Sequence, residues 1–199
     1  MGLPTNKRSS NGTSVQSSPA RRTRKPSAAD GRKAHVHEWP EITDLYHKVL
    51  DDYYGREDRR QALRYVPRLE ALLQQEAADH GAIFGEECWS LVSELRGDLP
   101  AAIKYRRSEI RLIRQLWKTL PGSPDHVREF LLSRHGPADL ADRYDLLAIL
   151  YHDAGQLKKA IKTLWQSREL CELHGIKFDG KDLLRDYLAE YRGVQAARR

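Results

Sequence analysis

Two stretches of this 199-residue chain repeat the same pattern 58 positions apart, and this internal match constrains the fold more than any other feature. The stretch GDLPAAIK at residues 97–104 aligns with GQLKKAIK at residues 155–162, with five identities in eight positions. A weaker third copy lies upstream, where residues 46–66 keep the mutual spacing of residues 144–164. Self-similarity at a fixed period is typical of folds built from stacked helical units.

The clearest copy places apolar and small side chains at helical spacing on both sides of a glycine. We expect Ala148 and Ala160 to let two helices approach closely, with the Tyr144 and Tyr151 rings filling the space at the rim. The glycine between the helices permits a positive φ where the first helix ends. The positions of this pattern are Tyr144, Leu147, Ala148, Tyr151, Gly155, Ala160 and Leu164.

This pattern resembles the tetratricopeptide repeat (TPR). In that family a bulky aromatic residue, Leu, a small residue and Tyr lie on a first helix, and a turn Gly, Ala and a large apolar residue follow. Residues 144–164 meet each of these positions, with Tyr144 in place of the usual Trp. The other two copies depart from the pattern at Leu50, Glu86 and Ser93. The resemblance implies a TPR-like α-solenoid, and the alternative is an ordinary helical bundle with coincidental spacing.

From Trp39 onward the apolar period is close to 3.6 residues and no strand alternation appears, which predicts an all-α fold. We expect about three antiparallel helix pairs and a C-terminal capping helix at residues 181–192. Pro67 should kink the second helix, and PGSP at residues 121–124 should separate the fourth helix from the fifth. The expected helices span residues 40–54, 58–80, 83–96, 99–118, 125–134, 137–152, 156–174 and 181–192.

The sequence divides into a basic tail at residues 1–37 and a helical repeat domain at residues 38–199. The tail holds eight Lys and Arg residues and one acid, a net charge of +7, whereas the whole chain carries +6. Residues 1–35 contain no aromatic side chain, so we expect the tail to be disordered. The run RRTRK at residues 21–25 is compatible with contact to nucleic acid, with nuclear import, or with a solubilising extension.

In the resembled family the first helices of successive pairs form a concave surface that holds peptides. Carrying these positions over to this chain gives a set of acidic and apolar side chains, which favours a basic or apolar partner segment. The alternative is that the acids keep an exposed helix face soluble. The set consists of Phe84, Glu87, Leu91, Glu94, Asp142, Asp145, Ile149 and His152.

A second charged feature lies on the fourth expected helix, where five cations recur at spacings of three and four residues and so share one face. Such a face can meet phosphates or an acidic partner. It can equally cover apolar surface with its aliphatic stems, or pair with acids of a neighbouring helix. The five residues are Lys104, Arg107, Arg111, Arg114 and Lys118.

Enzyme signatures are missing from the sequence, which has no HExxH, GxSxG, GxxxxGK or GxGxxG pattern. We therefore expect no catalytic, cofactor or metal site.

No run approaches the roughly 18 apolar residues of a membrane span, the N-terminus lacks a secretory pattern, and Cys88 and Cys171 stand alone. These features favour a soluble, cytoplasmic protein. The leading hypothesis is a non-catalytic protein–protein interaction scaffold, and the alternative is a nucleic-acid-associated protein using the tail and the basic helix face.

Overall fold

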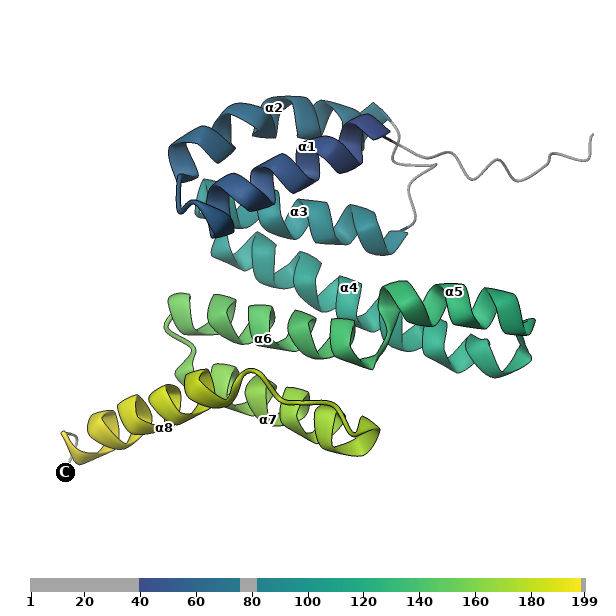
Figure 1. Ribbon diagram of the computed structural model, residues 1–199. Coiled ribbons are helices and arrows are strands. Elements are labelled where there is room, and N and C mark those ends of the chain that lie inside the picture. The colour runs from purple at the N-terminus through teal and green to yellow at the C-terminus, as the bar shows by residue number, and fades with distance from the viewer. Residues whose placement is uncertain (1–39, 76–81, 198–199) are drawn as a thin grey trace, which may run out of the picture. The chain divides into compact units, whose positions relative to one another are not determined.

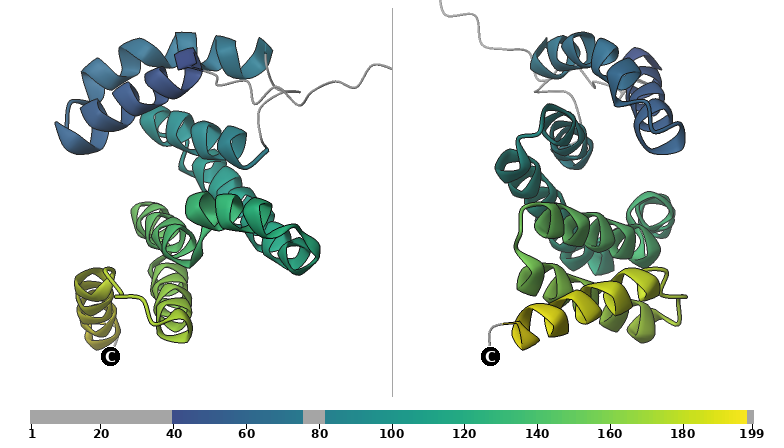
Figure 2. Two further views of the ribbon diagram at one scale, coloured as in Figure 1. Left: turned by 45° about the vertical axis from the view of Figure 1, so that its right-hand side comes forward. Right: turned by 90° about the vertical axis from the view of Figure 1, so that its left-hand side faces the viewer.

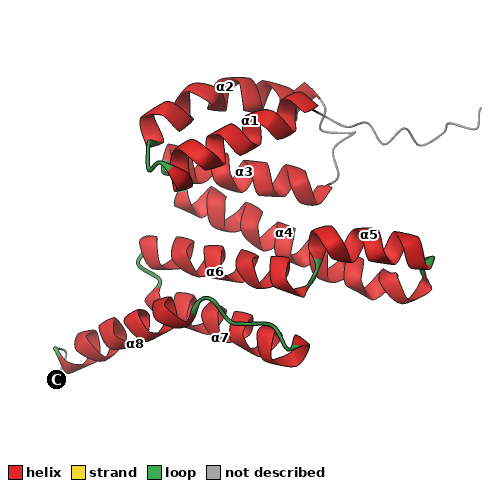
Figure 3. Cartoon of the chain, in the orientation of Figure 1, coloured by secondary structure: helices red, strands yellow, loops and turns green. Residues whose placement is uncertain are grey.

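The computed structural model describes residues 40–75 and 82–197, and these residues form helices joined by short loops (Figure 3). No strand occurs among them, which confirms the all-α class. The chain divides into Met1–Glu38 and Trp39–Arg199. The elements are α1 (Pro40–Leu50), a π-helical turn η1 (Asp51–Gly55), α2 (Arg59–Gln75), α3 (Ala82–Arg96), α4 (Leu99–Thr119), a 3-10 turn η2 (Leu120–Gly122), α5 (Asp125–His135), α6 (Pro137–Asp153), α7 (Leu157–His174) and α8 (Lys181–Ala196).

The helix boundaries differ from the expected ones by more than one residue at two places. The first helix gives way after Leu50 to the π-helical turn, and Glu57 adopts a positive φ of 55° before α2 begins. The last helix extends to Ala196, beyond the expected end at Arg192. The α2 helix continues through Pro67 to Gln75. The expected end of this helix at residues 76–80 and the expected disordered tail lie outside the described residues.

Successive helices pack against one another along the chain (Figure 1). The most extensive contacts join α3 to α4 and α6 to α7, and each of these pairs is an antiparallel hairpin. Further contacts join α1 to α2, α2 to α3, α4 to α6 and α7 to α8, whereas α5 lies against α6. Figure 2 shows the same hairpins from two other sides.

The turns inside the two large hairpins have the same backbone geometry. Gly97 and Gly155 both adopt the left-handed conformation, with φ of 79° and 69°. The amide of the next residue then closes each turn on the first helix, as Asp98 does on the Ser93 carbonyl at 2.9 Å and Gln156 on the Tyr151 carbonyl at 2.7 Å. Because a Cβ is disfavoured at such a φ, glycine suits both positions.

Small side chains lie at matching places in both hairpins. Ala148 and Ala160 are 0% exposed, and so are Ser90 and Ala102, which precede them by 58 positions. The Ser90 Oγ donates a hydrogen bond to the Ala102 carbonyl oxygen at 3.1 Å, which spans the helix pair directly. The α3/α4 hairpin therefore repeats the α6/α7 hairpin in its turn and in its buried small residues.

The apolar side chains gather in two clusters. One cluster contains residues of α1, α2 and α3, among them Val49, Val66 and Leu95. The other contains residues of α4, α6, α7 and α8, such as Ile113 and Leu164. The α3/α4 hairpin thus contributes one helix to each cluster.

A charged seam, defined here as Glu87, Arg106, Glu109 and Arg143, joins α3, α4 and α6. Glu109 is fully buried and accepts hydrogen bonds at 2.6 Å from both Arg106 and Arg143. The Arg143 guanidinium also lies 2.8 Å from the Glu87 carboxylate. Burial raises the pKa of Glu109, and the two arginines oppose this shift. Each buried charge in the seam therefore has a partner of opposite sign.

Candidate functional site

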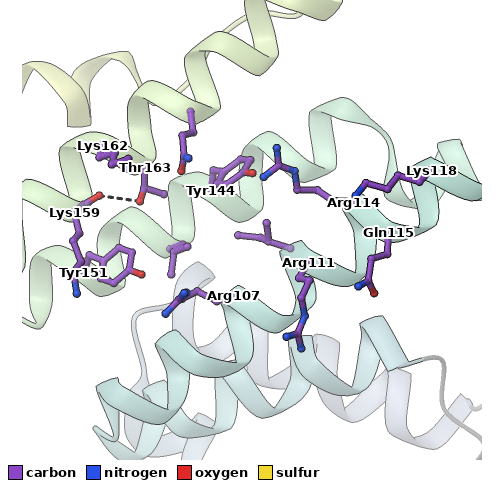
Figure 4. A pocket seen from close by; sticks show the side chains of 13 residues that line it. Arg107, Arg111, Arg114, Gln115, Lys118, Tyr144, Tyr151, Lys159, Lys162 and Thr163 are labelled. Carbon is purple, nitrogen blue, oxygen red and sulfur yellow. Dashed lines mark hydrogen bonds between the residues drawn. The ribbon is translucent and has the colours of Figure 1, made fainter.

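A groove lies between α4 and α7 with α6 at its floor, and its volume is about 680 Å³ (Figure 4). We call it the basic groove. The α4 side chains form one wall and the α7 side chains form the other, with tyrosines of α6 between them. The lining residues are Arg107, Ile110, Arg111, Arg114, Gln115 and Lys118 of α4, Tyr144, Leu147 and Tyr151 of α6, and Lys159, Lys162, Thr163 and Gln166 of α7.

The charge of the basic groove has one sign. Its lining includes six Lys and Arg side chains and no carboxylate. The ion pairs that α4 and α7 form within the described residues involve other side chains, namely Arg106, Glu109, Arg143, Arg168 and Glu172. A concave surface lined by cations focuses positive potential, so this site is suited to an anionic ligand.

The helical period explains why the α4 cations lie at the surface along the groove. On α4, the apolar residues Ile103, Ile110 and Ile113 turn toward the interior, and the cations at intervening positions are exposed. On α7, Lys159 and Lys162 lie in the first two turns, where the positive end of the helix dipole adds to their charge. All five cations expected on the α4 face are exposed, and all but Lys104 line the groove.

The aromatic floor of the groove is largely covered. Tyr144 and Tyr151 are 6% and 8% exposed. Burial raises the pKa of Tyr144, and the nearby Arg114 charge partly opposes the shift. The Lys159 ammonium lies 5.5 Å from the centre of the Tyr151 ring. Because the ring faces are covered, these tyrosines cannot serve as stacking platforms for nucleobases.

Four residues expected on a peptide-binding surface lie on α3, where internal contacts engage them. Glu87 accepts a hydrogen bond at 2.6 Å from the Tyr46 hydroxyl, and Phe84 meets the same ring edge-on at 5.3 Å. Glu94 accepts a hydrogen bond at 2.8 Å from the Tyr54 hydroxyl. Leu91 is 1% exposed and is part of the apolar cluster, so it is not available to a partner.

The remaining four residues of that set lie on α6. His152 stacks on the Tyr187 ring at 4.3 Å, and its Nε2 is 2.8 Å from the Glu190 carboxylate. Asp142 is exposed, and Ile149 is half-buried. Burial raises the pKa of Asp145 to about 6, and the charges of Asp142 and Asp179 add to the shift. The acidic set is therefore split, and much of it already serves contacts within the chain.

Several residues of the site and its surroundings were missed by sequence reasoning. Lys159 and Lys162 complete the groove, and no local pattern in the sequence placed them opposite the α4 cations. Arg106 and Glu109 are buried between the isoleucines of α4. Their position within the apolar stripe of that helix was the available sign that they form a buried pair.

Residues 40–75 and 82–197 contain neither a cluster of metal-binding side chains nor a membrane-spanning helix. No three His, Cys, Asp or Glu side chains gather there in a way that would hold a metal ion. None of the helices in these ranges combines the length and apolar character needed to cross a bilayer. Comparisons with protein-family models, curated proteins and solved structures find no match to this chain.

Proposed function

We propose that this chain is a non-catalytic helical-repeat binding protein of the TPR-like class, an adaptor that holds an acidic segment of a partner protein in the basic groove. The observation that carries the proposal is the lining of the groove, with six cations and no carboxylate. Two hairpins with matching turns and matching small residues support the repeat architecture. The groove replaces the acidic face of α3 and α6 as the partner site.

The test is a binding titration of the full chain with a fluorescein-labelled acidic peptide, compared with a basic peptide of equal length. The acidic peptide should bind, and added salt should weaken binding because the groove side chains are exposed. The double variant Arg107→Glu/Arg114→Glu should weaken binding at least about tenfold. The matched control is Arg60→Glu/Arg64→Glu, which makes the same charge change at two exposed positions on α2. Equal binding of both peptides, or equal loss in both variants, contradicts the proposal.

A second candidate function is association with nucleic acid, which the five exposed cations of α4 favour. In that case affinity for a single-stranded oligonucleotide should fall steeply with salt concentration, and removal of residues 1–35 should flatten the slope. An adaptor for an acidic protein segment should instead be nearly indifferent to removal of the tail.

A further inference from the structure

A second hollow continues the basic groove toward the C-terminal ends of α4 and α7. Its volume is about 500 Å³, and it shares Arg114, Lys118, Tyr144 and Gln166 with the groove. Since the two hollows have four lining residues in common, one extended ligand can occupy both.

The second hollow differs from the groove in its chemistry. Trp117, Leu170 and Leu173 line it, and Leu173 is 78% exposed. The indole N–H of Trp117 is already bonded to the His135 carbonyl at 2.6 Å, so its ring offers mainly apolar surface. An apolar side chain placed here would cover Leu173 and gain the free energy of removing both surfaces from water.

The basic groove and the second hollow together form one trough, and the chemistry of its lining changes along α7. On α7 the basic residues Lys159 and Lys162 lie toward the N-terminal end, and the apolar residues Leu170 and Leu173 lie toward the C-terminal end. On α4, Arg114 and Lys118 line both hollows. From Arg107 to Lys118, α4 rises roughly 16 Å at about 1.5 Å per residue. This length corresponds to about five residues of an extended peptide.

From this polarity we infer that the ligand is a peptide segment in which a short acidic run is followed or preceded directly by large apolar residues, with the acids in the basic groove and the apolar residues against Trp117, Leu170 and Leu173. The inference rests on the proposed function and adds the apolar half of the ligand. A nucleic acid fits less well, because the apolar surface of Leu170 and Leu173 gives a phosphate no hydrogen-bond donor, and Glu169 beside them is negatively charged.

The experiment uses the full chain and three labelled probes at one salt concentration. The first peptide carries about five acidic residues with Leu and Phe next to them, the second has the same acids with Ser in place of Leu and Phe, and the third probe is an oligothymidine. The first peptide should bind about tenfold more tightly than the second, which is the gain from burying one Leu-sized side chain. The variant Leu173→Ser should remove this difference without weakening the acid-only peptide. Leu132→Ser, which removes an exposed Leu from α5, is the matched control and should preserve the difference.

The outcomes separate the two proposals. Equal affinity of both peptides, with binding still lost in Arg107→Glu/Arg114→Glu, overturns the apolar half and leaves the proposed function standing. No binding of either peptide overturns the proposed function itself. Tighter binding of oligothymidine than of the first peptide, unaffected by Leu173→Ser, overturns both in favour of nucleic acid. A dimer seen by sedimentation that the first peptide fails to dissociate, while Leu173→Ser does dissociate it, identifies a second copy of the chain as the occupant and overturns the inference.

Discussion

Arg143 on α6 donates a hydrogen bond from its Nε to the Oε1 of Glu109 on α4 over 2.6 Å, and the carboxylate that accepts it is fully buried. The same carboxylate accepts a second hydrogen bond at 2.6 Å from Arg106, which is also buried. Within the described residues Arg106 pairs with this acid, whereas Arg143 also lies 2.8 Å from the Glu87 carboxylate and 3.1 Å from that of Asp139. A buried charge is costly when its partner is removed, which makes this carboxylate a sensitive point for stability.

Replacing Glu109 should destabilise the fold strongly. In Glu109→Gln, Arg106 and Arg143 lose their shared counter-charge, and we expect a loss of about 3–5 kcal/mol in the free energy of unfolding at pH 8, measured by urea titration. The control is Glu172→Gln, which breaks the exposed pair with Arg168 and should cost less than about 1 kcal/mol. Similar losses in the two variants would show that the seam contributes no more than a surface ion pair.

Overpacking the α6/α7 hairpin should also destabilise the protein. Ala160 is fully buried, so Ala160→Leu has no room for its added carbons and should cost about 1–3 kcal/mol. Thermal unfolding should show a lower Tm for this variant. Ala189→Leu places the same side chain at an exposed position of α8 and should leave the Tm nearly unchanged. An unchanged melt for Ala160→Leu would contradict the close approach of the two helices.

Two glycines should respond to alanine in opposite ways. Gly155 has a φ of 69°, so Gly155→Ala should cost about 1–2 kcal/mol of stability through backbone strain. Gly85 lies within α3, and a Cβ there meets nothing within 4 Å, so Gly85→Ala should add about 0.5–1 kcal/mol. Chemical denaturation of the two variants measures both effects. Changes of the same sign would refute the assigned turn geometry.

Asp145 should contribute a decline in the stability of the protein as the pH rises from about 4 to about 6. Burial, with the charges of Asp142 and Asp179 adding to it, raises the pKa of Asp145 to about 6 from 3.8. In this window the folded chain keeps a proton that the unfolded chain releases, so raising the pH favours unfolding. Because the carboxyl is partly solvated, we expect the effect to amount to about 1–2 kcal/mol.

The variant Asp145→Asn tests this dependence, because the amide keeps the shape of the side chain and cannot ionise. Its stability should vary less with pH across the window than that of the wild type, and it should be the more stable protein at pH 7. Asp44→Asn removes an exposed carboxylate from α1 and should keep the wild-type profile. Parallel pH profiles for Asp145→Asn and the wild type would exclude Asp145 as the source.

Local sequence signals account for most of the helices. The expected helix at residues 83–96 is found as Ala82–Arg96, and the one at residues 99–118 as Leu99–Thr119, because the apolar period and the glycine at 97 act within a few residues. The first turn was harder to predict, since its π-helical geometry has no glycine in the left-handed conformation. The shared face of the α4 cations was also predictable, because it depends on the period of a single helix.

The contacts between side chains of different helices could not be predicted from the sequence. The carboxylates of Glu87 and Glu94 look free in the sequence, and tyrosines about 40 positions away reach them in the folded chain. The basic groove needs lysines from α7 opposite arginines from α4, and no local pattern states that these helices are neighbours. Contacts of this kind follow from the packing angle of whole hairpins.

The seam between the two apolar clusters also determines how the protein responds to warming. Ionic hydration becomes less favourable as temperature increases, so the desolvation penalty of Arg106, Glu109 and Arg143 shrinks. The stabilisation from each square ångström of buried hydrocarbon reaches a plateau over the same range. Heating therefore strengthens the charged seam relative to the two apolar clusters on either side of it. The packing inside each apolar cluster should loosen before the two clusters separate from each other.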